Sequence, residues 1–156
     1  MTPEEARVRF AAARVAHLAT ADARGTPHVV PITFALDGAE IVTAVDGKPK
    51  RSTALRRLDN LAANPRVAVL VDAWDEDWSR LWWARADGIA EVVANGEALR
   101  VAQALLRERY PQYARVPIDG PAVRIRVERW TGWAAAGPRA GLVSVLRPQR
   151  SHSPNR

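Results

Sequence analysis

A cluster of positive charge lies in the segment from Val45 to Ser52. Lys48, Lys50 and Arg51 fall within four positions, directly before a stretch with helical spacing. The N–H groups and the dipole at the start of a helix favour an anion, and lysine and arginine side chains add charge-assisted hydrogen bonds. The segment therefore predicts a grip for a phosphate or carboxylate group, although a solvated basic loop accounts for the charges equally well.

The run from Thr26 to Phe34 is a second candidate site. Alternation along a strand places Pro31 and Thr33 on one face and Ile32 on the other. Proline has no N–H group to donate to a neighbouring strand, so Pro31 predicts an edge strand, a bulge or a position that faces a ligand. A flat aromatic cofactor could lie against this face, while the alternative is an edge strand with an incidental proline.

Tryptophan is frequent, with six residues in a chain of 156. Trp74, Trp78, Trp82 and Trp83 lie close together in the sequence. Large aromatic side chains lower solubility when they are exposed, so most should lie in a core or an interface. We interpret the cluster as a contact between two subunits in preference to the wall of a ring-binding cleft. Arg85, beside it in the sequence, could reach an acidic part of a cofactor.

Residues for acid–base, nucleophilic or metal chemistry are few. The absence of cysteine excludes thiolate metal sites and cysteine nucleophiles, and it fits a reducing compartment. No pair of the three histidines has metal-ligand spacing, so we expect no metal. His17 is expected in the core or the interior of a barrel. Because no serine–histidine–acid set or glycine-rich dinucleotide motif is present, we expect no catalytic residue.

The distribution of charge along the chain bears on the kind of partner it binds. The chain carries +6, but four arginines from Arg139 onward have no acidic neighbour, and residues 72–91 are acidic. A protein that binds duplex DNA is expected to carry a continuous basic face, so the pattern predicts a small anionic ligand and no nucleic acid. No run approaches the roughly 18 apolar residues of a membrane span, and the start lacks an apolar signal core. We expect a cytoplasmic protein without membrane contact.

The elements that must position these residues follow from periodicity and turn signals. A hairpin is expected at Asp37–Gly38, and a bend at Asp87–Gly88 in a long strand. Together they predict a mainly β (α+β) domain over 1–137, an antiparallel sheet closed into a barrel with helices at its edges. A loose basic tail is expected over 138–156. The predicted helices are 2–13, 52–64 and 97–109, and the predicted strands are 14–20, 26–36, 39–45, 66–71, 81–94 and 122–130.

Two runs carry a resemblance to a known family. Residues 13–34 resemble the opening hairpin of the pyridoxamine 5′-phosphate oxidase-like flavin-binding split barrels, in which T-x-D-x-x-G-x-P leads into V-x-P-x-x-F. Residues 48–70 are similar to the basic residue, helix, N-P-R-V and strand of the same family. Residues 77–88 look most like the branch that uses the deazaflavin coenzyme F420.

The resemblance implies a homodimer with two cofactor sites at the subunit interface. The lysines would bind the cofactor phosphate or neighbouring carboxylates, the strand with the proline would lie along the ring, and the tryptophan-rich strand would come from the partner subunit. The substrate-phosphate residues of the pyridoxamine phosphate oxidases are not identifiable. The implied cofactor-binding residues are Pro31, Ile32, Thr33, Ala44, Val45, Asp46, Lys48, Pro49, Lys50, Arg51, Ser52, Trp82 and Arg85.

The resulting hypothesis is an F420-dependent oxidoreductase that transfers hydride from the reduced deazaflavin to a small unsaturated substrate. Such chemistry belongs to the cofactor, which agrees with the poor catalytic inventory of the chain. Two alternatives remain open. One is an FMN-binding oxidase or reductase of the same fold, and the other is a non-catalytic protein that binds F420 or a flavin.

Overall fold

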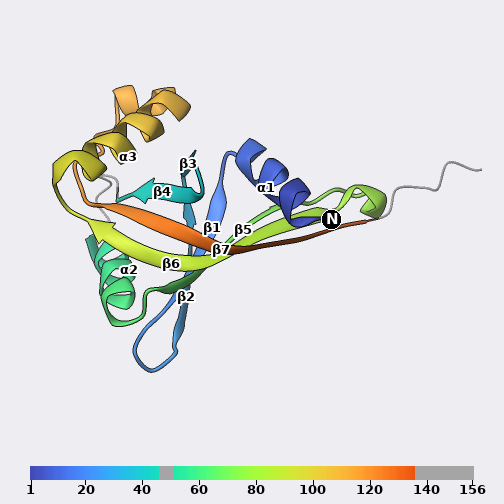
Figure 1. Cartoon of the computed structure of the whole chain (residues 1–156), viewed down its shortest axis with the longest axis horizontal. Helices are drawn as coiled ribbons and strands as arrows, with labels where there is room; N and C mark the ends of the chain where they lie inside the picture. The colour runs from blue at the N-terminus through green and yellow to red at the C-terminus, as the bar shows by residue number, and fades with distance from the viewer. Residues whose placement is uncertain (46–50, 136–156) are drawn as a thin grey trace, which may run out of the picture.

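The computed structural model describes residues 1–45 and 51–135, with the backbone alone for 51–55, so the predicted tail lies outside the described residues (Figure 1). No helix in the described part is long and apolar enough to cross a lipid bilayer. The elements, in chain order, are α1 (Pro3–Ala12), β1 (Ala16–Ala21), β2 (Pro27–Ile32), β3 (Ala35–Asp37), β4 (Glu40–Ala44), α2 (Arg51–Ala63), β5 (Arg66–Ala73), the 3₁₀ turn η1 (Trp78–Arg80), β6 (Trp82–Val93), α3 (Gly96–Arg109), the 3₁₀ turn η2 (Pro111–Ala114) and β7 (Ala122–Ala134).

The seven strands form one antiparallel sheet in the order β2-β1-β5-β6-β7-β4-β3. Strands β2 and β3 are the two edges, yet only Thr33 and Phe34 separate them in the chain. The sheet must therefore curl until its edges approach each other. The result is the predicted antiparallel split barrel with flanking helices (Figure 1).

The chain leaves one edge strand and enters the other at Thr33 and Phe34. The single strand predicted over 26–36 is therefore wrong, because it is divided into β2 and β3 at these two residues. Thr33 and Phe34 lie outside the ladder, and side chains bind their backbone groups instead. The Thr43 hydroxyl donates to the Thr33 carbonyl (2.8 Å), and the Phe34 N–H donates to the Tyr110 hydroxyl (3.1 Å). Thr43 lies ten residues away in the next hairpin, but Tyr110 is 76 positions away, and local periodicity does not reveal it.

Local sequence accounts for the ends of α1. Thr2 is the N-cap, and its hydroxyl accepts a hydrogen bond from the Glu5 N–H, while the Glu5 carboxylate accepts one from the Thr2 N–H. This reciprocal pair is a capping box. The hydrogen bond from the Thr2 backbone also lowers the pKa of Glu5. The predicted cap at Thr2 is confirmed.

The longest strands, β6 and β7, pair along most of their length. Their register shifts between Asp87 and Gly88, which confirms the predicted bend. A Cβ atom at position 88 would lie 2.4 Å from the Arg126 carbonyl oxygen, so the close approach of the two strands requires glycine there. The last strand continues to Ala134, four residues past its predicted end at Trp130, because β6 offers backbone partners that far.

Two apolar clusters fill the fold. In the larger one, Phe10 of α1 packs against Phe34 and Trp130, with ring centroids 4.9 and 5.0 Å away. In the smaller one, Ala102 and Leu106 of α3 cover β3, β4 and the start of β7. Helices α1 and α3 thus contribute to different parts of the core.

Candidate functional site

The predicted anion-binding segment connects β4 to the first turn of α2. Ala44, the last residue of β4, is buried, and the Val45 N–H donates to the Pro121 carbonyl (3.0 Å). Gly120 packs against the same backbone, since a Cβ atom there would lie 2.7 Å from the Val45 oxygen. The entrance to the segment is therefore fixed. Asp46, Lys48, Pro49 and Lys50 lie outside the described residues, as do the side chains of Arg51 and Ser52.

The three predicted ring-contacting residues of β2 point in different directions. Pro31 is exposed on β2, which pairs only with β1, so the predicted edge strand is confirmed. Ile32 is 5% exposed and belongs to the core, which leaves only its backbone for a ligand. The Thr33 hydroxyl forms a short hydrogen bond with the Tyr113 hydroxyl of η2. Pro31 and Thr33 therefore border two different surfaces.

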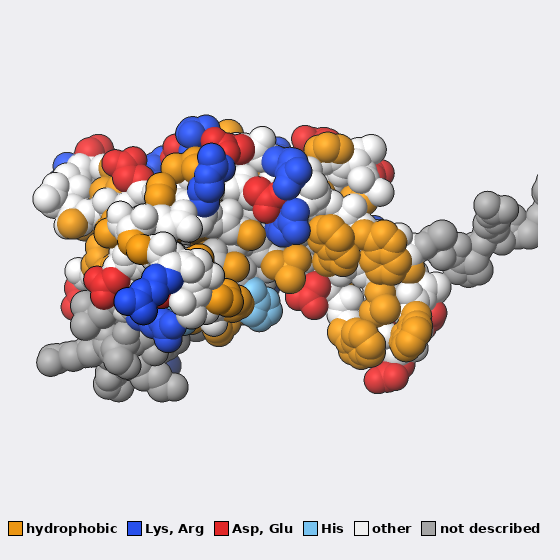
Figure 2. Space-filling model, turned by 90° about the horizontal axis from the view of Figure 1, so that it is seen from below, with side chains coloured by type: hydrophobic (Ala, Val, Ile, Leu, Met, Phe, Trp, Pro, Cys, Tyr) orange, Lys and Arg blue, Asp and Glu red, His pale blue; other side chains and the backbone are white. Residues whose placement is uncertain are grey.

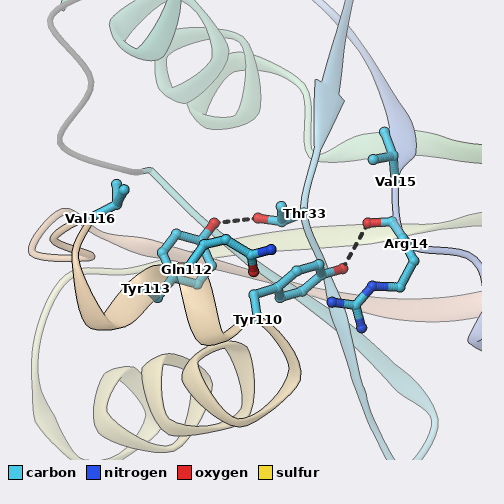
Figure 3. A pocket seen from close by; sticks show the side chains of 7 residues that line it. All are labelled: Arg14, Val15, Thr33, Tyr110, Gln112, Tyr113 and Val116. Carbon is cyan, nitrogen blue, oxygen red and sulfur yellow. Dashed lines mark hydrogen bonds between the residues drawn. The ribbon is translucent and has the colours of Figure 1, made fainter.

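Thr33 lines a pocket of about 330 Å³ between the start of β1, the end of β2 and η2 (Figure 3). Most of its wall is made of aromatic rings and valine side chains, with a few polar groups. The Arg14 guanidinium lies over the Tyr110 ring, 4.5 Å from the centroid, and donates to the Arg109 carbonyl (2.9 Å). The lining residues are Arg14, Val15, Thr33, Tyr110, Gln112, Tyr113 and Val116.

Tyr110 forms the rigid floor of this pocket. Its side chain is 5% exposed. The Tyr110 hydroxyl accepts a hydrogen bond from the Phe34 N–H. It lies within donating distance of two carbonyl oxygens, that of Phe34 (2.8 Å) and that of Arg14 (3.0 Å). Arg109 adds donors to the carbonyls of Ala11 and Ala13. The β1 start, the β2–β3 passage and the end of α3 are thereby tied together before any ligand binds.

A second pocket, of about 500 Å³, lies on the outer face of the sheet. Register places residues of four strands side by side there, because His17 is opposite Leu70, and Leu70 is opposite Arg85. Arg85 Nε lies 2.9 Å from one oxygen of Asp87, and Arg129 Nη2 lies 2.8 Å from the other. Asp87 therefore has a guanidinium group on each side, and Asp72 adds a second carboxylate to this face. The lining residues are His17, Ala19, Val29, Ala68, Leu70, Asp72, Trp83 and Arg85.

Two predicted residues of β6 lie on opposite faces. Arg85 lines the outer pocket, whereas Trp82 packs against the larger core cluster, with the Arg9 guanidinium 5.1 Å from its ring centroid. Positions separated by an odd number along a strand point to opposite sides. The fold therefore does not bring these two side chains together within one chain.

Exposed tryptophans lie near the end of β5, in η1 and near the end of β7, close to where β6 begins. Trp74 and Trp78 are 70% and 69% exposed and meet edge to face with centroids 6.5 Å apart, while Trp133 is 47% exposed. Figure 2 shows a face on which hydrophobic side chains gather at this end of the molecule, with acidic side chains at the rim. These tryptophans are therefore not part of the core of the described chain.

Comparison with known proteins decides the family. The pattern of the pyridoxamine 5′-phosphate oxidase family matches residues 2–134. The chain belongs to this family. Among curated protein sequences, none matches it significantly.

Proteins whose solved structures have a similar fold bind different cofactors. An FAD-binding protein from Mesorhizobium loti is 22% identical, with a TM-score of 0.67 over 85% of this chain and 94% of that one. The conserved protein Rv2991 from Mycobacterium tuberculosis is 26% identical, with a TM-score of 0.65 over 86% of each chain. HutZ, the heme storage protein from Vibrio cholerae, is 20% identical, with a TM-score of 0.64 over 86% of this chain and 95% of that one. Members of this fold family thus include flavin-binding and heme-binding proteins.

Within this pyridoxamine 5′-phosphate oxidase-like fold, the β1–β2 hairpin carries two histidines, His17 and His28, which face opposite sides of the sheet. The expectation that His17 is buried is wrong, because alternation with Ala16 and Leu18 turns its side chain outward. His28 lies on the inner side, and its Nδ1 has no hydrogen-bond partner among the described residues. Burial, with Arg56 and Arg57 nearby, lowers the pKa of His28. Over the described part of the chain, no group of three or more histidines and acids could hold a metal ion.

The pocket at η2 contains residues that sequence reasoning missed. Tyr110 follows a helix directly, and Gln112 and Tyr113 come after Pro111, in a stretch with neither strand nor helix periodicity. The spacing of the two tyrosines by three positions across a helix end was the available signal, because such residues share one side of a turn. Nothing local indicates that this turn reaches Thr33, 80 positions away.

Proposed function

We propose that this member of the family is a cytoplasmic F420-dependent oxidoreductase that works as a homodimer. The observation that carries the proposal is the place of the cationic segment. It leads from a fixed point at the end of β4 into the N-terminus of α2, the 13-residue helix Arg51–Ala63. Backbone N–H groups at such a helix start favour an anion, and Lys48, Lys50, Arg51 and Ser52 add cations and a hydroxyl group.

The cofactor ring would lie along the edge formed by Pro31, the Ile32 backbone and Thr33, next to Ala44 and Val45. An edge strand leaves backbone groups free on one side, and Pro31 presents no N–H group to be satisfied. Both pockets adjoin this edge, since Val29 of β2 lines one and Thr33, the residue after β2, lines the other. The chain therefore has space on either side of a bound ring.

The homodimer would bury the outer face of β2, β1, β5 and β6. Val29 is 59% exposed there, and Leu70 and Trp83 line the pocket on the same face. Only strand residues line the pocket on this face in the part of the chain that the structure describes, so a second copy of the chain is the occupant we propose. Arg85, ion-paired with Asp87, would then stand near the partner's cofactor.

When bound, reduced F420 supplies hydride to an electron-poor double bond. The chain would contribute binding, orientation and exclusion of water, and the proton that completes the reduction would come from solvent. Accordingly we assign no catalytic residue. FMN oxidase or reductase chemistry and non-catalytic binding of F420 or a flavin are the competing functions of the same site.

Heme binding is a second candidate, favoured by the exposed His17 in the outer pocket. An imidazole beside the apolar surface of Leu70 and Val29 suits an axial ligand of a flat macrocycle, and Arg85 on the same face suits a propionate. This function would use the outer pocket rather than the β4–α2 segment.

Side-by-side titration of the full-length protein with F420, FMN and hemin tests these functions. We expect F420 to bind most tightly, read by fluorescence for F420 and FMN and by absorbance for hemin. Lys50→Ala should weaken F420 binding about tenfold or more, because a charge-assisted contact is lost. Arg107→Ala, an exposed cation on α3, is the matched control and should bind as wild type does.

Tight FMN binding without F420 binding would replace the proposed cofactor. Hemin binding that is lost in His17→Ala and kept in Lys50→Ala would favour the heme function. Cofactor binding without turnover of any substrate in a panel of electron acceptors would favour the non-catalytic function, in which the protein only binds the cofactor. An unchanged F420 dissociation constant in Lys50→Ala would remove the β4–α2 segment from the site.

A further inference from the structure

We propose that the pocket between β1, β2 and η2 binds the substrate, a small flat molecule whose carboxylate is conjugated to an unsaturated carbon. This inference rests on the proposed reductase function and deepens it by naming the substrate class. It is carried by the lining of the pocket, which combines aromatic walls with one guanidinium group (Figure 3).

The size of the pocket suits one ring. Its volume of about 330 Å³ lies at the lower end of the range of about 300–1,000 Å³ that small-molecule sites occupy. Tyr110, Tyr113, Val15 and Val116 offer flat and branched apolar surface. A single ring with a short unsaturated side chain fits such walls better than a tricyclic cofactor with its ribityl chain does.

The charge of the pocket selects an anion. Arg14 donates to the Arg109 carbonyl, and a guanidinium group has further N–H donors. No carboxylate of the described residues pairs with Arg14, and none of the seven lining residues is acidic. Figure 3 shows the Gln112 side chain among the same lining residues. A carboxylate in the pocket would meet the Arg14 guanidinium, and the unsaturated part of the same molecule would meet the aromatic and valine side chains.

The position of the pocket links it to the proposed cofactor ring. Thr33 belongs to the edge along which the ring would lie, and its side chain lines the pocket. The Thr33–Tyr113 hydroxyl pair and the hydrogen bonds of Tyr110 hold this wall in place. Preorganised walls lower the entropic cost of binding, so even a small molecule can be oriented there.

The test uses trans-cinnamate as the probe and cinnamyl alcohol as its neutral match, titrated into the full-length protein by calorimetry. Cinnamate should bind at least about fivefold more tightly than the alcohol, because only the anion gains a charge-assisted bond. Arg14→Gln should abolish this preference while still binding the alcohol, which also shows that the variant folds. Arg14→Lys should keep most of the preference, and Arg107→Gln, an arginine outside the pocket, should keep all of it.

A second titration saturates the protein with F420 before cinnamate is added. An unchanged cinnamate affinity supports a separate substrate pocket, whereas competition would show that the pocket holds the cofactor itself and would overturn the inference. Equal binding of cinnamate and the alcohol, or an unchanged preference in Arg14→Gln, would overturn it as well.

The two proposals fail separately. Tight F420 binding without Arg14-dependent cinnamate binding overturns the substrate pocket and leaves the proposed function intact. Arg14-dependent cinnamate binding without binding of F420 or FMN supports an anion pocket at this place and overturns the reductase function.

Discussion

The two faces of β1, β5 and β6 differ although they come from the same residues in alternation. On the inner face, Leu18, Val69 and Ala84 have no exposed surface, because they lie in the larger apolar cluster, to which α1 contributes Phe10. On the outer face, the neighbouring positions His17, Leu70 and Trp83 line an open pocket. Only one of these faces is covered by the described chain itself.

The difference teaches that alternation alone does not distinguish a core from an interface. Both faces contain leucine, valine or tryptophan, and both offer apolar area whose burial is favourable. The two faces differ in what packs against them. A helix of the same chain stabilises the monomer through one face, and a partner would stabilise the assembly through the other.

The largest effect is expected on the inner face. Phe10→Ala should lower the free energy of unfolding by about 3–5 kcal/mol, because it removes a fully buried ring and leaves a cavity beside Phe34 and Trp130. Urea unfolding followed by circular dichroism measures this loss. Val8→Ala, on the exposed side of α1, is the control and should change little. Equal losses in both variants would contradict the assignment of the inner face.

A change on the outer face should act on assembly rather than on folding. Trp83→Glu places a charge in the face that we propose to be buried between two copies, so the protein should sediment as a monomer at micromolar concentration. Val8→Glu, on a side chain that is 59% exposed on α1, should leave the mass unchanged. A wild-type monomer, or a Trp83→Glu variant that stays dimeric, would break the comparison between the faces.

The smallest effect concerns pH and the inner side of β2. Burial, with the charges of Arg56 and Arg57, lowers the pKa of His28 in the folded protein. Below the ordinary histidine pKa of about 6.5, the unfolded chain binds a proton that the folded protein does not, so stability should fall as pH falls. Wild type should therefore lose more stability than His28→Gln between about pH 7.5 and 5 in urea titrations. Parallel losses would show that His28 does not carry this dependence.

Much of the architecture is predictable because its signals are local. The cap at Thr2, the hairpin at Asp37–Gly38 and the bend at Gly88 each depend on a few neighbouring residues. The division of the strand at Thr33 was missed, because Tyr110 and Tyr113, which bind Phe34 and Thr33, lie 76 and 80 positions away and approach only in the folded protein.

The candidate site divides in the same way. Sequence alone identified the positive segment before α2 and the proline of an edge strand, since charge runs and missing N–H groups are properties of the residues themselves. Alternation along the predicted strand already places Trp82 and Arg85 on opposite sides, but sequence alone could not show which side belongs to the core, or that His17 points outward. Those outcomes depend on which face of the sheet a helix covers.

Sequence by itself thus determined the elements, the family resemblance and the charged segment, because these depend on residue type and short-range order. Tertiary structure alone decided that Arg14, Thr33 and Tyr113 meet around one pocket. The physical reason is that curling the sheet brings its two edges and the turn after α3 together, and no local interaction encodes that approach.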